Sequence, residues 1–180
     1  MMKIKWMAMA LGLGLVATGA QGSALVTQGA NELAISGMVD FQSDMGVELD
    51  LNVRYAYFLI DRVAIGTKVL MYNNDTYNHF GLGLTGEYNF KLPQQFKPLF
   101  GTDLVPFLGG AVDFRHTRIY GSKESAVVFG GEGGVKFFLT DTAAVTTSVL
   151  GELATEDIFA DDGEATNLDL RLLVGMRFYF

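Results

Sequence analysis

The feature that most constrains this chain is a period of two in its apolar residues. From Asn31 to Phe180, successive stretches of roughly ten residues place apolar side chains at every second position. Polar or small residues fill the positions between them. A β-strand turns alternate side chains to opposite faces of a sheet, whereas a helical pattern repeats every 3.6 residues. The pattern therefore predicts an all-β fold.

Turn signals divide this pattern into separate strands. Tight turns are expected at Asp61-Arg62 and at Thr140-Asp141-Thr142, and polar loops follow the third, fifth and seventh segments. Two connections depart from this regular scheme, since 43–46 is very short and 91–103 is long and holds two prolines. The predicted strands cover residues 32–41, 47–57, 63–71, 80–90, 104–115, 127–137, 143–154 and 167–180.

Alternation alone leaves open which face lies inside a closed barrel. A water-soluble barrel would bury its apolar face and carry its charges outside. Here the apolar face holds rows of Leu, Phe and Tyr, too bulky for the narrow interior of eight strands, and the polar face is rich in Gly, Ala, Ser and Thr. The mean hydropathy is +0.26, yet beyond the N-terminus no apolar run is long enough for a transmembrane helix. The sequence favours a closed antiparallel eight-stranded transmembrane β-barrel with its apolar face outward.

Aromatic residues at the strand ends agree with that arrangement. Two groups are expected, one near each end of the barrel, as in proteins that cross two membrane interfaces. The first comprises Tyr55, Tyr57, Tyr88, Phe90, Phe137, Phe178 and Phe180, and the second comprises Phe41, Phe80, Phe114 and Phe129.

The N-terminus has the features of an export signal. Lys3 and Lys5 precede an apolar stretch, 7–16, which is too short to span a bilayer, and small residues follow it. Cleavage after Ala20 or after Ala24 fits these small residues. We expect residues 1–24 to be a signal peptide and 25–180 to be a single barrel domain, the alternative being an uncleaved membrane anchor.

Charged residues of both signs lie on the predicted inner face. A closed interior requires such charges to be paired, so we expect a network that largely plugs the lumen. Glu87 lies on the same face, and closure of the barrel should bring Arg171 and Arg177 near Glu32 and Asp40. The predicted network consists of Glu48, Asp50, Arg54, Lys68, Asp113, Arg115, Glu132, Lys136, Glu152, Asp169, Arg171 and Arg177.

Composition and motifs exclude several classes of function. The net charge of −7 argues against nucleic acid as a partner, and without cysteine there is no disulfide or thiolate site. No nucleotide-binding, metalloprotease or hydrolase motif occurs, so no cofactor and no catalytic residues are expected. The acidic segment 154–164 is interpreted as a solvated loop, with oxygen ligation of a divalent cation as the alternative.

The chain ends on Gly175-Met176-Arg177-Phe178-Tyr179-Phe180, an aromatic strand where most proteins have a frayed, polar end. Gly175, Phe178 and the terminal Phe180 resemble the C-terminal targeting strand of bacterial outer-membrane proteins. Together with the signal peptide, the chain resembles the small barrels of the OmpA, OmpX and OmpW type.

This resemblance implies short periplasmic turns, polar external loops and a location in the Gram-negative outer membrane. The implied partners are the barrel-assembly machinery, membrane lipid and lipopolysaccharide, and the implied state is a monomer. The resemblance alone does not determine the function, because this fold hosts several functions. We expect a structural or surface-interaction role. A narrow conduit for small solutes is the alternative, and a lipid A-modifying enzyme comes third. His116 is similar to the histidine of lipid A deacylases, but the serine two residues on is replaced by Arg118. We therefore expect His79 and His116 to be rim residues in external loops.

Overall fold

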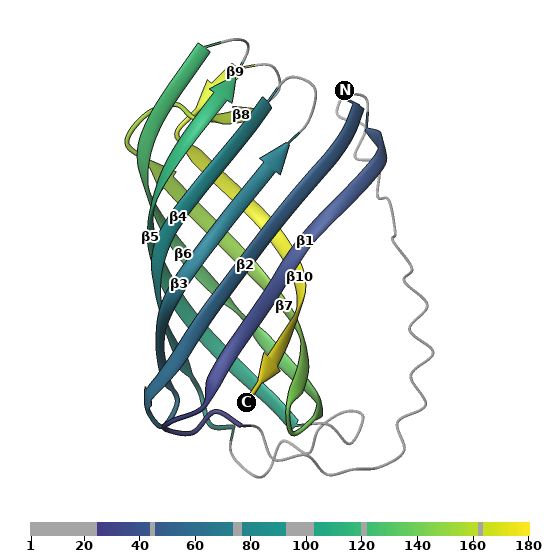
Figure 1. The fold of residues 1–180 in the computed structure, drawn as a ribbon, viewed down its shortest axis with the longest axis vertical. Coiled ribbons are helices and arrows are strands. Elements are labelled where there is room, and N and C mark those ends of the chain that lie inside the picture. The colour runs from purple at the N-terminus through teal and green to yellow at the C-terminus, as the bar shows by residue number, and fades with distance from the viewer. Residues whose placement is uncertain (1–24, 44–45, 74–76, 93–102, 120–121, 162–163) are drawn as a thin grey trace.

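The computed structural model describes residues 25–43, 46–73, 77–92, 103–119, 122–161 and 164–180. Within these ranges the chain forms eight long strands and one short hairpin (Figure 1). The bounds are β1 Asn31–Ser43, β2 Gly46–Ile60, β3 Val63–Asn73, β4 Tyr77–Asn89, β5 Asp103–Ile119, β6 Ser122–Thr140, β7 Ala143–Ala154, β8 Phe159–Asp161, β9 Glu164–Thr166 and β10 Leu168–Tyr179.

The long strands form a closed antiparallel barrel. Each pairs with its neighbour along the chain, and β10 pairs with both β7 and β1, which closes the ring. The predicted fold class, an all-β closed barrel of eight strands, is therefore confirmed for the described residues. No helix among these residues has the length and the apolar character needed to cross a membrane.

Two tight turns mark one end of the barrel. Asp61-Arg62 joins β2 to β3, and Asp141-Thr142 joins β6 to β7. Arg62 has φ of 70°, the left-handed conformation that such turns require, and a register shift precedes each turn. The C-terminus lies at the same end, which we call the periplasmic end, and the opposite end with β8 and β9 is the outer end (Figure 1).

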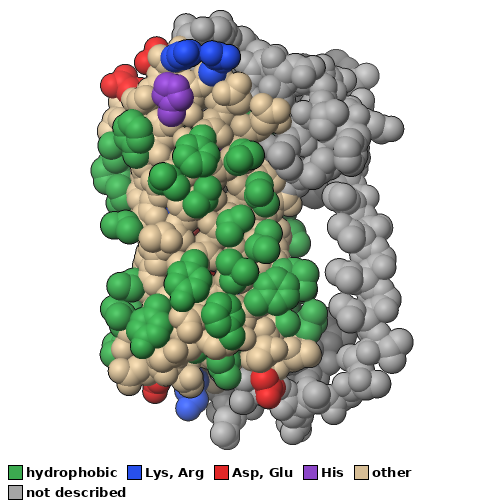
Figure 2. Space-filling view, in the orientation of Figure 1, with side chains coloured by type: hydrophobic (Ala, Val, Ile, Leu, Met, Phe, Trp, Pro, Cys, Tyr) green, Lys and Arg blue, Asp and Glu red, His purple; other side chains and the backbone are tan. Residues whose placement is uncertain are grey.

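The outer surface of the barrel is apolar. Leu84, Leu170 and Leu172 are exposed to 69%, 74% and 73%, and large apolar side chains stand out all along the outer face (Figure 2). Inward positions of strands such as β3, β7 and β10 are buried or half-buried, which reproduces the predicted alternation. Continuous exposed apolar surface of this kind is stable in lipid and not in water. The assignment of the apolar face to the outside is confirmed.

Aromatic side chains lie toward both ends of this surface. Tyr55, Tyr57, Tyr88, Phe90, Phe178 and Phe180 are exposed toward the periplasmic end, and Phe80, Phe114 and Phe129 toward the outer end. Phe137, which the sequence places in the first group, is only partly exposed, and the side chain of Phe41 lies outside the described residues. The two groups match the aromatic girdles of transmembrane barrels.

The junction between β1 and β10 is the shortest in the ring. It pairs Glu32–Ser36 with Gly175–Tyr179, whereas β10 pairs with β7 along its whole length. Gly175 lies at the end of this junction, and a Cβ there would approach the carbonyl oxygen of Ile35 to 2.7 Å. Glycine at this position therefore allows the backbones of the first and last strands to meet.

Candidate functional site

The inward-facing charges fall into two layers, one nearer each end of the lumen. In the layer nearer the periplasmic end, Glu32 on β1 and Glu87 on β4 are the central acids. Arg54 lies 2.9 Å from Glu32 and 2.7 Å from Glu87, and Arg177 lies 2.7 and 2.6 Å from the same two carboxylates. Lys136 bridges both, at 2.7 Å from Glu32 and in direct contact with Glu87. Five different strands therefore meet in this layer.

Glu132 on β6 extends the periplasmic layer toward the middle of the barrel. Its carboxylate lies 3.5 Å from Arg54 and 3.7 Å from Arg177, and it accepts a hydrogen bond of 2.7 Å from the hydroxyl of Ser148. With Glu132 the layer has three acids and three cations. Such a balance suits a buried site, where an unpaired charge is costly.

Aromatic rings surround the cations of this layer. Lys136 lies 5.3 Å from the ring centre of Phe107, 5.6 Å from Tyr179 and 6.0 Å from Phe58. Arg177 lies over the Phe107 ring at 4.4 Å. These cation–π contacts add favourable interactions for the buried cations and exclude water from the layer.

An apolar cluster closes the lumen below this layer. Phe58, Val105, Phe138 and neighbouring alanines pack against Val26, which belongs to the segment that precedes β1. Backbone hydrogen bonds hold this segment under the barrel, with the Arg62 amide donating to the Val26 carbonyl at 2.9 Å. This segment lies outside the strands that the alternation predicts.

The second layer lies nearer the outer end. Arg115 donates to Asp113 at 2.5 Å and contacts Glu152 directly, and all three side chains are fully buried. Lys68 reaches the same two acids, at 2.6 Å from Asp113 and 3.6 Å from Glu152. Arg171 contacts Glu152 as well, which links β10 to the layer.

Arg171 also pairs with two acids at the margin of this layer. Its guanidinium lies 3.3 Å from Asp50 on β2 and 2.6 Å from Asp169 on its own strand. Of the partners expected for the two arginines of β10, Glu32 does pair with Arg177. The side chains of Asp40 and Glu48 lie outside the described residues.

A hairpin covers the outer end of the lumen. The segment interpreted from sequence as a solvated acidic loop contains β8 and β9, and its Ile158 and Phe159 are buried against Ala126 and Val128. The Phe159 ring lies 5.5 Å from the guanidinium carbon of Arg115. The hairpin places apolar side chains over the outer ionic layer, although Glu156 and Asp157 are exposed.

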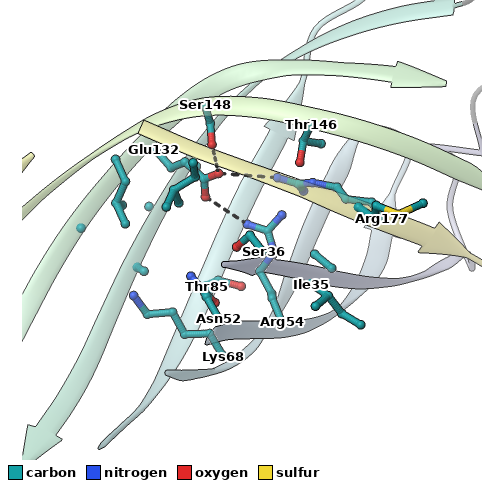
Figure 3. A pocket seen from close by; sticks show the side chains of 18 residues that line it. Ile35, Ser36, Asn52, Arg54, Lys68, Thr85, Glu132, Thr146, Ser148 and Arg177 are labelled. Carbon is teal, nitrogen blue, oxygen red and sulfur yellow. Dashed lines mark hydrogen bonds and ion pairs between the residues drawn. The ribbon is translucent and has the colours of Figure 1, made fainter. Parts of the chain in front are cut away.

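A small polar cavity remains between the two layers (Figure 3). Arg54, Glu132 and Arg177 border it from the periplasmic layer, and Lys68 borders it from the outer layer. Its volume of about 40 Å³ is large enough for a few water molecules, since one needs roughly 10–15 Å³. Its remaining polar lining includes Ser36, Asn52, Thr85, Thr146 and Ser148.

The two histidines occupy different environments. His79, expected in an external loop, lies instead in β4 with its ring buried and stacked on Tyr72 at 5.5 Å. The expectation was wrong because β4 begins before the strand that the alternation predicts. His116 also lies in a strand, β5, rather than in a loop, but it is exposed near the outer rim, and its Nδ1 lies 2.9 Å from the hydroxyl of Ser125 on β6. A search along the chain for a serine partner misses this contact, because the pairing of β5 with β6 creates it.

The residues of the predicted assembly signal lie at the closing strand. Phe178 on β10 and Phe180, directly after β10, are exposed to 38% and 64%. The backbone of Phe180 exchanges two hydrogen bonds with Asn31, at 2.8 and 3.1 Å. The terminal residue therefore takes part in closing the barrel.

Among solved structures, the chain is similar to the N-terminal β-barrel domain of OprF from Pseudomonas aeruginosa. The identity is 15%, the TM-score is 0.57, and the match covers 85% of this chain and 98% of that domain. It is also similar to Neisserial surface protein A, with 16% identity, a TM-score of 0.55, and coverage of 84% and 96%. No family model and no curated protein sequence matches the chain.

The chain has the fold of the small outer-membrane β-barrels. Its location in the outer membrane follows from this fold together with the apolar outer surface and the charged interior. The lumen is filled by buried salt bridges.

Proposed function

We propose that this protein is a structural or surface-interaction barrel whose lumen is closed. The observation that carries the proposal is the pair of ionic layers, each built from side chains of several strands. Arg115, Glu152, Lys136 and Glu32 are each no more than 1% exposed, so water has little access to either layer. A solute crossing the barrel would have to separate ion pairs in both layers, which is costly in a site of low dielectric constant.

A narrow conduit for small solutes is the second candidate, and the polar cavity between the layers favours it. Hydroxyl and amide groups line this cavity, and such groups can hold water. Conduction through it would require both ionic layers to rearrange. The apolar clusters at the two ends of the lumen would have to open as well.

An enzymatic role has less support. The contact between His116 and Ser125 involves two of the three groups that a hydrolytic triad needs. In the described part of the chain, no carboxylate is hydrogen-bonded to His116 to orient its ring. We therefore propose that this pair has no catalytic role.

A liposome-swelling assay tests the proposal against the conduit. Vesicles that contain the folded protein should swell no faster than empty vesicles in glycine, arabinose or glucose. Swelling that depends on solute size would show an open path and would favour the conduit.

The lipid A mass spectrum of cells expressing the protein should also stay unchanged, and a change lost in His116→Ala would establish an enzyme.

The proposal includes partners and a route of assembly. We propose that the aromatic C-terminal strand is read by the barrel-assembly machinery and that the folded monomer contacts lipopolysaccharide at its outer end. Exposed apolar positions up to Phe114 and Phe129 near that end support contact with the lipid of the outer leaflet.

A further inference from the structure

Two cations stand side by side on the outer face of the barrel at its outer end. Arg118 on β5 and Lys123 on β6 are Cα partners, and both are exposed. Figure 2 shows Lys and Arg side chains at this end, beside a histidine and above the hydrophobic side chains. The other cations of the described residues lie elsewhere, six in the ionic layers and the remainder, Arg62 and Lys91, at the periplasmic end.

The order of residues along the two strands places this pair just beyond the apolar surface. The outward-facing partners are first Phe114 with Val127, then His116 with Ser125, and finally Arg118 with Lys123. Four residues of a tilted strand advance about 10 Å along the membrane normal. The apolar stems of Arg and Lys can lie along apolar surface, so their charged groups can span the remaining distance along the membrane normal to the headgroups. The cations are therefore within reach of the lipid headgroups.

The histidine below the pair is held in place. The 2.9 Å contact between His116 and Ser125 fixes the imidazole directly beneath Arg118 and Lys123. Within the described residues, neither cation forms a salt bridge to an acid. Glu124 alternates to the other face of β6, where its partner is the buried Thr117. Two unpaired cations and a fixed imidazole form a site for an anion.

The chemistry of the surroundings identifies the class of anion. The whole chain carries a net charge of −7, so the protein as a whole does not attract a free anion electrostatically. An anion attached to acyl chains gains more, because Phe80, Phe114 and Val127 lie exposed just below the cations. Arg and Lys are the side chains that bind phosphate best.

We propose that Arg118, Lys123 and His116 bind a phosphate group of a phosphorylated outer-leaflet lipid of the lipopolysaccharide class. The proposal refines the surface-interaction role proposed above and rests on it for the location of this face in the outer leaflet. It does not depend on whether the lumen conducts, so a failure of the closed-lumen proposal is distinguishable from a failure of this site.

Imidazole NMR provides a direct test, because the chain has two histidines and only His116 lies at this surface. The folded protein in maltoside micelles, without divalent cations, is titrated with bisphosphorylated lipid A. The His116 resonances should shift while those of the buried His79 stay in place. The double variant Arg118→Gln/Lys123→Gln should weaken binding about tenfold or more. Lys91→Gln, which also removes an exposed cation, is the control and should leave binding unchanged.

Three results would overturn the proposal. The first is equal binding of lipid A whose phosphates have been removed. The second is wild-type affinity in the double variant. The third is an equal His116 shift with inorganic phosphate at the same concentration, which would show a general anion site without lipid selectivity. A large conductance would leave the lipid site standing and would count against the closed lumen only.

Discussion

At the scale of single residues, each buried charge in the lumen depends on partners from other strands. Lys136 is fully buried and touches both Glu32 and Glu87. If one cation is removed, the remaining acids keep their desolvation cost but lose part of their attraction. The surrounding structure cannot supply water freely, because Phe107 and Tyr179 enclose the site.

Lys136→Met should therefore lower the free energy of unfolding by about 3–5 kcal/mol. Urea unfolding of the protein in lipid vesicles measures this change. Lys91→Met, at an exposed position, is the matched control and should change stability by less than about 0.5 kcal/mol. Adding Glu87→Gln to Lys136→Met should recover part of the loss, because it removes the acid that the lysine neutralised. Equal stability of wild type and Lys136→Met would contradict the paired network.

The sequence predicts which charges face inward but not how they pair. Arg54, Lys136 and Arg177 are correctly placed on the inner face by alternation alone. Glu32 and Glu87 are on that face too, yet their central position follows from the stagger of the strands around the barrel. That stagger is a property of closure and has no local signal in the sequence.

At the scale of elements, the long strands could be predicted because alternation persists over ten or more residues. The hairpin β8–β9 and the segment before β1 could not, because each is too short to show a period. Ile158 and Val26 are single apolar residues that predict no buried contact from sequence alone. They become buried because the closed barrel has open ends against which these segments pack.

The outward face of β10 gives a prediction about depth in the membrane. Val174 is central among the outward residues from Leu168 to Phe180, so Val174→Arg should destabilise the barrel by about 2–4 kcal/mol. The same change at Leu168, nearest the outer end of the strand, should cost about 1 kcal/mol or less. Unfolding in lipid vesicles distinguishes the two variants. Equal losses at both positions would be inconsistent with the proposed orientation of β10.

At the scale of the whole molecule, Phe180 belongs both to the closed ring and to the proposed assembly signal. Phe180 closes the ring through its backbone and presents its side chain to lipid. Phe180→Ala keeps the backbone hydrogen bonds to Asn31 and removes only the aromatic ring. It should reduce the fraction of heat-modifiable, folded barrel in the outer membrane several-fold and leave unfolded chain in the periplasm.

Phe90→Ala, which also removes an exposed aromatic ring at the periplasmic end, is the control for this assembly defect. It should assemble at close to the wild-type level. If Phe180→Ala assembles equally well, the C-terminal ring is not the feature that the machinery reads.

We expect the whole lumen, with its apolar ends and two ionic layers, to behave as one closed unit. Conductance across a planar lipid bilayer measures that closure most directly. The wild-type monomer should show only small and rare conductance steps. Arg171→Gln removes the cation shared by Asp50 and Glu152, so it should raise the frequency of these steps and also lower the free energy of unfolding. A large, steady current from the wild-type protein would contradict the closed lumen.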